Sequence, residues 1–539
     1  MNIPLFSDVL NRVARNRIRR IMRGYRFLKK TGQLGLLVAV KDELANARFS
    51  KIERKASKLF FGAGIERAEL MVRQYLLIRI GGLGLNEALL YSLGAKGSPV
   101  VYPMPRLWQN VVASHGFPVA RVRSSLAWSG YVLFLWGYGI LLIMIQLYGS
   151  FRKKPCSRSF RRYVYFMGLI PNNVPRFCKD GSGYDIITWY IRWNGRAKDL
   201  DCVYHGVTDA KGCSVDGLPV VFNPDPVPPL NTLKSITRFV GWSILAALFS
   251  IFDLLRGHWW HAVLLAESAK GSLTRLQSSD RLARDYLFHQ SGCTYRPLWT
   301  YEAEKKGARI IFYFYSTNCE RFKCADGYSE QMGNWNVMNW PMYLVWDEFQ
   351  ADFVRRAVGA AANIEIVNPI YFVSCSVEMP KIPAGSFAVF DVQPQRDSRY
   401  QILGAAEEYY VPRITNQFLL DIHECIRECN GTMVHKRKRH NKRWLHPRYE
   451  VLVKRLSGEK DVISVEPDTS AARVTESCLA VISMPFTSTA LWGKELGKPS
   501  VYYDPFGVVQ KDDRAAHGVK VLCGKNELRE WLFSTKSSW

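Results

Sequence analysis

Residues 481–491 read VISMPFTSTAL, and this stretch decides the fold. The apolar run at 479–482 predicts a buried strand. The hydroxyl residues at 487–489 then begin a predicted helix, which ends at Gly497. A second apolar run follows at 500–503. Strand, turn, helix and strand in this order predict one βαβ unit of a parallel sheet.

The turn itself is a candidate anion site. In an open α/β sheet the strand-to-helix turns lie at the carboxyl edge, where ligands bind. A helix N-terminus favours anions there, because it offers unpaired N–H groups and the positive end of the helix dipole. Alternatively, Thr487 or Ser488 only caps the helix. One hydroxyl suffices for a cap, so the run that also includes Thr489 favours an anion site.

Regular alternation of strands and helices continues on both sides of this unit. Strands are expected at 387–392, 432–436, 462–466, 479–484, 500–504 and 519–523, and helices at 415–429, 447–457, 469–477, 487–496 and 526–533. This alternation predicts a doubly wound parallel sheet, which is a Rossmann-like domain, over residues 386–539. Pro380, Pro383 and Gly385 interrupt the pattern in front of it and mark a domain boundary.

A strongly basic loop is expected at the same edge of the sheet, because all strand-to-helix loops of a parallel sheet open there. Residues 435–443 read HKRKRHNKR, and a His-Pro pair follows at 446–447. The candidate phosphate ligands in this loop are Lys436, Arg437, Lys438 and Arg439. Binding and releasing a phosphate needs fixed positive charge, N–H donors and a proton source. His446 suits the last role, because free histidine has a pKa of roughly 6.5.

Each signal has a simpler explanation when it is taken alone. A basic run is also typical of a nuclear-localisation or RNA-binding patch. A His-Pro pair is also an ordinary helix start with Pro at the first helical position. The convergence of both with the turn at 487–489 on one edge favours a nucleotide or phosphosugar site.

These residues resemble a known family. Residues 484–490 (MPFTSTA) and 497–505 (GKPSVYYDP) look like the bacterial polysaccharide-biosynthesis proteins named for their Pro-Phe-Thr-Ser motif. Segments 389–394 and 418–422 resemble that family too, and the likeness thins out toward the N-terminus. The resemblance implies a role in making surface carbohydrates and a GT-B-like fold, in which two Rossmann-like domains face a cleft. Asp504 then becomes a further donor-binding candidate.

A more distant resemblance is to bacterial sialyltransferases and Kdo transferases of that fold. In those enzymes a His-Pro motif and a later Ser/Thr motif hold the phosphate of a CMP-sugar. The pairs at 446–447 and 488–489 match in order and approximate spacing, which implies a CMP-linked donor and His446 as a catalytic residue. Those enzymes also carry a paired-acid-Gly motif that supplies the general base, and it has no full match here. The nearest candidates are Asp326, Asp347 and Glu348.

The composition indicates what kind of partner the protein binds and in which cellular compartment it lies. The net charge of +26 calls for an acidic partner, such as nucleic acid, anionic lipid or a phosphorylated ligand. The 12 Cys occur without a Cys-x-x-Cys pair, which favours reduced thiols in the cytosol over a disulfide or zinc framework. Basic residues begin at Arg12 with no apolar stretch before them, so no signal peptide is expected.

Residues 1–70 are expected to form a basic helical extension. Apolar side chains recur there at three- to five-residue spacing from Leu10 to Leu28, and arginines lie between them. A basic amphipathic helix of this kind typically lies on an anionic membrane surface. The alternatives are the solvated face of a packed helix and an arm that binds nucleic acid.

Residues 71–378 are expected to form the N-terminal, acceptor-binding α/β domain. A turn that runs into a strand fits 97–102, and strands fit 117–122, 184–190, 200–204, 309–315 and 343–346. Two apolar segments, 129–149 and 239–255, are expected to be buried or membrane-dipping helices. The first is long enough to span a bilayer, which takes roughly 20 residues. However, basic residues flank it on both sides, against the positive-inside bias of a single span.

Taken with these resemblances, the sequence implies a metal-independent glycosyltransferase without a cofactor, associated peripherally with the cytoplasmic face of the membrane. The donor would be a nucleotide-sugar, and the acceptor a growing surface polysaccharide, such as capsule or O-antigen, or a lipid-linked glycan. The alternative is a membrane-associated basic protein that binds nucleic acid or phosphoglycan without catalysis. A nucleic-acid partner is not expected, because the sequence has no RNA-binding signature.

Overall fold

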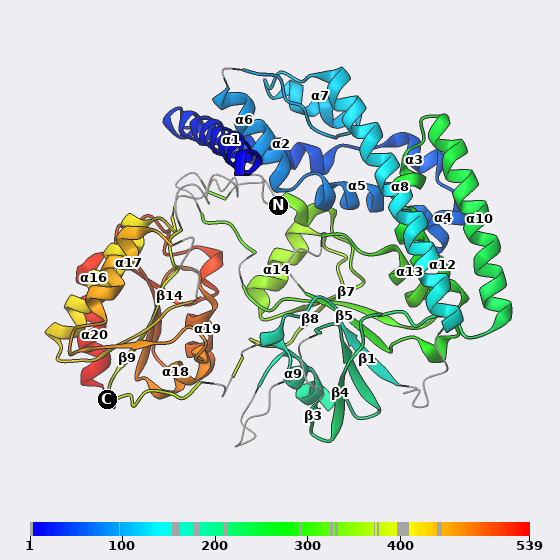
Figure 1. Cartoon of the computed structure of the whole chain (residues 1–539). Coiled ribbons are helices and arrows are strands. Elements are labelled where there is room, and N and C mark those ends of the chain that lie inside the picture. The colour runs from blue at the N-terminus through cyan, green and yellow to red at the C-terminus, as the bar shows by residue number, and fades with distance from the viewer. Residues whose placement is uncertain are drawn as a thin grey trace.

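The computed structural model describes most of the chain. The described residues are 4–95, 97–152, 162–175, 184–195, 197–208, 213–289, 294–317, 319–323, 327–328, 333–370, 372–373, 377–395, 409–438 and 445–538. They form a helical N-terminal part followed by two sheets, each covered by helices (Figure 1).

The C-terminal sheet confirms the alternation expected from the sequence. Its strands are β9 (Phe387–Phe390), β10 (Met433–Lys436), β11 (Val462–Val465), β12 (Ala480–Ser483), β13 (Ser500–Asp504) and β14 (Lys520–Cys523). Its helices are α16 (Pro412–Glu428), α17 (Pro447–Leu456), α18 (Ala471–Ser477), α19 (Ser488–Glu495) and α20 (Gly524–Ser537). Every strand pair is parallel, and buried apolar side chains line both faces of the sheet.

The strand order fixes where this sheet binds ligands. The order is β11-β10-β9-β12-β13-β14, so the chain starts in the middle, builds one side and then returns to build the other. At the reversal, between β9 and β12, the connecting loops leave in opposite directions and open a crevice at the carboxyl edge. The turn at 484–487 follows β12 and therefore lies at this switch point.

The N-terminal sheet has the same plan with two more strands. Its strands are β1 (Tyr163–Phe166), β2 (Cys202–His205), β3 (Cys213–Val215), β4 (Leu218–Phe222), β5 (Asp285–His289), β6 (Arg309–Tyr313), β7 (Met342–Val345) and β8 (Ile364–Ile366). The order is β3-β4-β2-β1-β5-β6-β7-β8, and only β3 pairs antiparallel. The switch point lies between β1 and β5. Two Rossmann-like domains, one per sheet, confirm the GT-B-like architecture that the resemblance implied.

The strand expected at 184–190 is wrong. This segment forms α9 (Ile186–Arg192) instead, because the Asp185 side chain caps the helix by accepting the N–H groups of Ile187 and Thr188 at 2.8 and 3.0 Å. The other helices of this domain are α10 (Leu233–Leu255), α11 (Trp260–Val263), α12 (Leu265–Leu276), α13 (Leu298–Lys305) and α14 (Glu348–Ala357).

The helical part is longer than expected. It comprises α1 (Pro4–Lys30), α2 (Gly35–Asn46), α3 (Ser50–Lys55), α4 (Lys58–Phe61), α5 (Ala68–Arg79), α6 (Leu83–Gly94), α7 (Arg106–Ser114) and α8 (Arg121–Arg152). The strands expected at 97–102 and 117–122 are wrong, because these segments meet only in one isolated bridge between Val100 and Val119. Prolines at 99, 103, 105 and 118 remove backbone donors that a sheet needs. Helices thus continue past residue 70 to Arg152.

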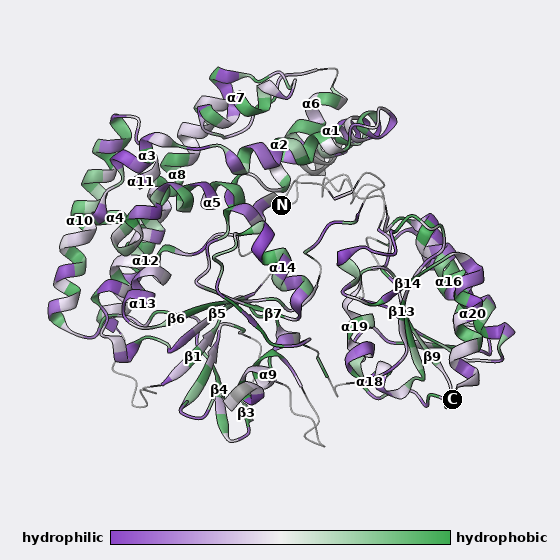
Figure 2. Ribbon diagram, turned by 180° about the vertical axis from the view of Figure 1, so that it is seen from behind, coloured by the Kyte–Doolittle hydropathy of each residue, from purple (hydrophilic) through white to green (hydrophobic). Residues whose placement is uncertain are grey.

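The two apolar segments form long helices on the outside of the N-terminal domain, where α8 and α10 lie side by side (Figures 1 and 2). Among the described residues, these two helices are long and apolar enough to cross a membrane, and the bent pair 58–79 and 83–94 would make a third if it counted as one span.

The basic helix α1 packs against α6. Its apolar residues Ile21, Tyr25 and Leu28 are buried, and its arginines at 15, 17, 19, 20 and 23 are exposed. The two helices approach closely at Gly24 and Gly94, because neither residue has a side chain there. Ile21, Tyr25 and Leu28 are therefore covered by protein, whereas the outward face of α1 offers charge together with the exposed side chains of Ile18 and Phe27.

This close approach predicts that Gly94→Ala destabilises the protein. A Cβ at position 94 would lie 1.8 Å from the backbone oxygen of Arg20, which cannot move aside as a flexible side chain would. Such overpacking costs about 1–3 kcal/mol. We expect a Tm several degrees lower by differential scanning fluorimetry. The control is Gly241→Ala in α10, where a Cβ meets nothing within 4 Å. An unchanged Tm for Gly94→Ala would show that α1 does not pack there.

Candidate functional site

The two domains meet at the carboxyl edges of their sheets. Loops after β6 and β7 contact the turn after β12 and the loop after β13. The N–H and hydroxyl of Thr317 lie 3.4 Å from Oγ of Ser488. Nδ1 of His517 lies 2.7 Å from a carboxylate oxygen of Asp347. The edges at which parallel sheets bind ligands therefore face each other across this contact.

The turn at 485–487 is the centre of this contact. The hydroxyls of Tyr410 and Tyr502 donate to the carbonyls of Pro485 (2.7 Å) and Thr487 (3.0 Å). The Phe486 ring packs 5.0 Å from Phe322 of the other domain. The Pro and Phe of the motif thus hold the turn and join the domains, which leaves the hydroxyl residues to serve a ligand.

The three hydroxyl residues have different environments. Thr487 is at the N-cap position of α19, but its side chain does not cap the helix, because it donates to the Met484 carbonyl (2.9 Å). The Thr489 hydroxyl lies 2.8 Å from that of Ser483. Ser488 is half-buried at the domain contact. The Thr487 side chain therefore does not cap α19. The first N–H groups of the helix still face the carboxyl edge, where an anion would accept hydrogen bonds from them.

The cationic residues of the loop after β10 do not all have the same role. One lysine is structural, and the others are candidates for ligand binding. Lys436 is buried, and its Nζ donates to the carbonyls of Pro467 (3.1 Å) and Arg437 (3.3 Å). Burial lowers the Lys436 pKa to about 8. Lys436 therefore clamps the loops after β10 and β11 together. Arg437 is half-buried and Lys438 exposed, whereas Arg439 lies outside the described residues.

His446 begins α17 at the same edge. Its backbone N–H donates to the Pro394 carbonyl (3.0 Å), which joins the loop after β10 to the loop after β9. Nδ1 of its half-buried ring accepts the Arg448 N–H at 3.3 Å. Because Nδ1 is an acceptor, the neutral ring carries its proton on Nε2. That N–H is the group that a leaving phosphate would need.

Asp391 supports this position and was missed by the sequence reasoning. It follows β9 and is buried, and its carboxylate accepts the Tyr449 hydroxyl of α17 at 2.6 Å. Nε2 of buried His435 lies 3.3 Å from the same carboxylate. The three side chains tie α17, and with it His446, to the sheet. An acidic residue directly after an apolar strand was the available signal.

Asp504 has a structural role in the turn after β13. It is fully buried, and its two carboxylate oxygens accept the N–H groups of Phe506 (3.1 Å) and Val509 (2.7 Å). A carboxylate satisfied in this way holds the loop rather than a phosphate, which it would also repel.

The carboxylates proposed as the general base are also engaged. Asp347 accepts the Gln350 N–H at 2.9 Å as the N-cap of α14, in addition to its contact with His517. Glu348 is exposed and lies 3.4 Å from Arg355. Asp326 lies outside the described residues. Asp347 thus caps a helix and joins the domains, so a base must be sought elsewhere.

His289 is a base candidate that the sequence reasoning missed. It ends β5 beside β1, at the switch point of the N-terminal sheet. Its Nε2 donates to the Gly168 carbonyl (2.8 Å), which leaves the basic nitrogen of the neutral ring at Nδ1. Burial lowers the His289 pKa below the usual value, so the ring is neutral at pH 7. A His directly after an apolar strand was the signal.

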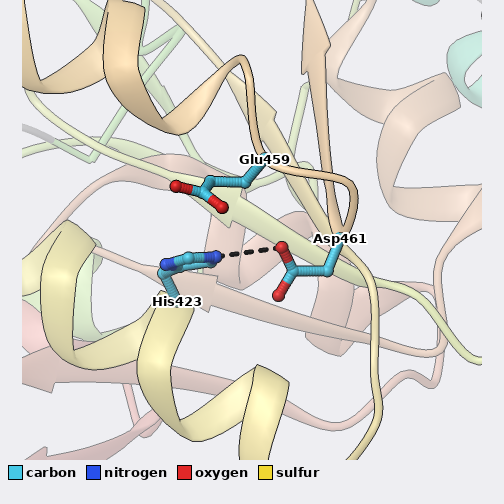
Figure 3. A group of neighbouring side chains, drawn as sticks. All are labelled: His423, Glu459 and Asp461. Atoms are coloured by element: carbon cyan, nitrogen blue, oxygen red, sulfur yellow. Dashed lines mark hydrogen bonds and ion pairs between the residues drawn. The ribbon is translucent and has the colours of Figure 1, made fainter.

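A cluster of metal-ligand types lies away from this edge. His423, Glu459 and Asp461 come together in front of β11, at the amino edge of the C-terminal sheet (Figure 3). Nε2 of His423 lies 3.1 Å from Asp461. Within the described part of the chain, this is the only group of three such residues close enough to share an ion.

The sequence matches one family model, described as polysaccharide biosynthesis PFTS motif protein, over residues 242–532. The match spans β5 to β14 and includes the turn at 485–488. No curated protein matches the sequence.

Several solved structures are similar at low identity. Sucrose-phosphate synthase from Thermosynechococcus elongatus aligns with a TM-score of 0.37 and 11% identity, over 70% of this chain and 90% of its own. Anabaena Alr3699/HepE in complex with UDP and glucose aligns with a TM-score of 0.34 and 10% identity, over 70% and 89%. UDP-GlcNAc 2-epimerase from Methanocaldococcus jannaschii aligns with a TM-score of 0.27 and 8% identity, over 51% and 74%.

Proposed function

Because the chain belongs to the polysaccharide biosynthesis PFTS motif family, we propose that it is a glycosyltransferase that uses a nucleotide-activated sugar. One observation carries the proposal. The carboxyl edges of two Rossmann-like sheets face each other at the motif turn, and the edge that holds the uncapped N-terminus of α19 also carries the basic loop and His446. A sugar nucleotide would place its phosphate or diphosphate at the edge of the C-terminal sheet and its sugar at the facing edge of the N-terminal sheet.

The C-terminal domain would hold the donor phosphate. Ser488 and the first N–H groups of α19 supply hydrogen bonds, and the helix dipole adds to them. Arg437, Lys438 and Arg439 supply fixed positive charge. Cationic side chains can stabilise the leaving phosphate without a divalent cation, and this is the basis for proposing a metal-independent reaction. His446 would donate a hydrogen bond from Nε2 to the leaving phosphate as the bond to the sugar breaks, because the neutral ring keeps this proton.

The N-terminal domain would hold the acceptor. His289 is the proposed general base, which takes the proton of the acceptor hydroxyl as it attacks the sugar. The acceptor class follows from the family, whose members act in polysaccharide biosynthesis: a growing surface polysaccharide or a lipid-linked glycan. Such acceptors are assembled at the cytoplasmic face of the membrane, where we place the protein as a peripheral protein. The donor nucleotide stays open, and CMP is the candidate that the His-Pro and Ser-Thr pairs favour.

Ser488→Ala tests the phosphate site. A hydrogen bond to a charged group contributes about 1.5–3 kcal/mol, and about 1.4 kcal/mol is a factor of ten. We therefore expect affinity for the donor nucleotide to fall at least roughly tenfold. Calorimetric titration measures it, after a thermal-shift screen of CMP, UDP, GDP and dTDP has identified the nucleotide. Ser500→Ala, at the amino edge of the same sheet, is the control. Equal affinities for wild type and Ser488→Ala would refute the site.

His446→Ala tests the hydrogen-bond donor to the leaving phosphate. Loss of a donor that stabilises the charge developing in the transition state lowers turnover by about a hundredfold or more, whereas nucleotide affinity changes little. A donor with a better leaving group needs less of this stabilisation, so it should restore part of the lost rate. Steady-state kinetics with both donors measure kcat and KM separately. Normal turnover by a folded His446→Ala protein would exclude the catalytic role, and nucleotide binding without any transfer by the wild type would favour a noncatalytic binding protein.

His289→Gln tests the base through the pH profile. A base acts in its neutral form, and burial lowers the His289 pKa. The wild-type kcat/KM should therefore fall only as the pH drops through a value below about 6.5, the unperturbed pKa of histidine. His289→Gln should lose that inflection together with about a hundredfold or more of the rate. An unaltered acid limb in the variant would assign the base to another residue.

A further inference from the structure

The helix pair α8 and α10 carries a surface that the proposed chemistry does not use. The two helices run antiparallel. The start of α8 meets the residue before α11, where the rings of Trp128 and Trp259 lie 5.0 Å apart. The end of α8 meets the start of α10, where Oγ of Ser150 accepts the Leu230 N–H at 3.3 Å. Between these ends, Trp136 donates to Ser250 at 3.0 Å.

One side of this pair is packed against the domain along its whole length. The buried residues of α8 are Ser124, Trp128, Val132, Leu135, Gly139, Ile143 and Ser150, and those of α10 are Ile236, Phe239, Trp242, Ser243, Ala246, Ser250 and Asp253. The contact is tight, because a Cβ on Gly139 would lie 2.8 Å from the Leu265 side chain of α12. Neither helix can cross a bilayer while this contact holds, because the domain would have to enter the bilayer with it.

The other side, here called the outer face, is apolar and exposed. Its residues on α8 are Val122, Leu126, Leu133, Phe134, Tyr138, Leu141, Met144, Ile145, Tyr148 and Phe151, and those on α10 are Leu233, Ile244, Leu245, Leu248, Ile251, Phe252 and Leu255. Each has between 41% and 82% of its surface exposed. A continuous apolar surface of this length is unusual on a protein that meets only water. Figure 2 shows the hydrophobic colour recurring along α10.

Charge on this surface is confined to its ends and has one sign. Arg121, Arg123 and Arg256 are exposed at one end, and Arg152, Lys234 and Arg238 at the other. The Arg256 and Arg152 guanidinium groups lie over the rings of Phe252 (3.8 Å) and Tyr148 (5.4 Å). No acidic residue occurs in α8.

The single acid of α10 is turned inward. Asp253 is buried, and its carboxylate lies 2.6 Å from Nδ1 of buried His261. The outer face thus presents apolar side chains between two basic ends.

We propose that the outer face of α8 and α10 lies in one leaflet of an anionic membrane, with both helices parallel to its surface and neither crossing it. The apolar side chains would enter the acyl region, and the basic ends would pair with anionic headgroups. A second copy of this chain fits less well, because any pairing of the two faces brings basic ends against basic ends in a protein of net charge +26.

This surface is separate from the basic helix α1, which packs against α6 through Gly24 and Gly94. The proposal rests on the membrane location named above, but on none of the residues given a chemical role.

Paired substitutions on the outer face test the proposal in the full chain. Leu141→Glu with Leu248→Glu changes two exposed leucines, 48% and 62% exposed, so the fold should be kept. The assay is co-flotation with vesicles of phosphatidylcholine and phosphatidylglycerol at physiological salt. We expect the bound fraction to fall at least roughly tenfold, since two leucines no longer leave water. Wild-type binding should also weaken on vesicles of phosphatidylcholine alone.

Two controls make the result specific. Val451→Glu makes the same kind of substitution once, at an exposed apolar residue of α17, 70% exposed, and should float like the wild type. The paired variant should keep the Tm of the wild type, which shows that it is folded and keeps this test independent of the proposed function.

Trypsin distinguishes an in-plane pair from a crossing pair. Trypsin trapped inside the vesicles should leave the protein intact, whereas added trypsin should cleave exposed arginines. Cleavage at Arg121 or Arg152 from inside would show a span and overturn the proposal. Unchanged flotation of the paired variant would overturn it as well. A wild-type protein that does not float and is a dimer, while the paired variant is a monomer, would assign the outer face to a second copy.

Discussion

The pairing of β9 with β12 is the constraint on which the candidate site depends. In register, Val389 lies opposite Ile482 and Phe390 opposite Ser483, so the two strands end together. The segments that follow them, from Asp391 and from Met484, therefore start side by side and leave in opposite directions. This geometry places the uncapped N-terminus of α19 at the same sheet edge as the loop after β10 that carries His446, with β9 between the two strands, although some forty residues separate them in sequence. The strand order, rather than any side chain of the turn, brings the parts of the site to one edge.

Some residues of the family motif hold the two domains together, and others are placed to bind a ligand. Phe486 packs against Phe322, and the carbonyls of the turn are fixed by tyrosine hydroxyls. With its backbone held in this way, the turn keeps the first N–H groups of α19 in place without a side-chain cap. A preorganised set of donors stabilises charge better than one that must rearrange as charge develops. The structural residues of the motif thus contribute to chemistry through the geometry they maintain.

Much of the C-terminal domain could be predicted from the sequence, because each element is short, regular and bounded by a clear signal. The strand before Pro485 and the helix begun by Pro447 are examples. The failures have local causes. Asp185 turned an apparent strand into a helix by capping it, and prolines excluded a sheet at 97–122. The contacts of Thr317 with Ser488 and of Asp347 with His517 join residues about 170 positions apart, and no local pattern encodes them.

The account's central claim is that a nucleotide phosphate binds at the N-terminus of α19, and hydrogen–deuterium exchange tests it most directly. The first amides of α19, at Ser488 and Thr489, exchange readily as long as no acceptor occupies them, and a bound phosphate would protect them. With the donor nucleotide present, exchange should slow in residues 484–492 and in the segment after β9. A nucleotide that binds tightly, yet slows exchange only elsewhere and leaves 484–492 unchanged, would contradict the account.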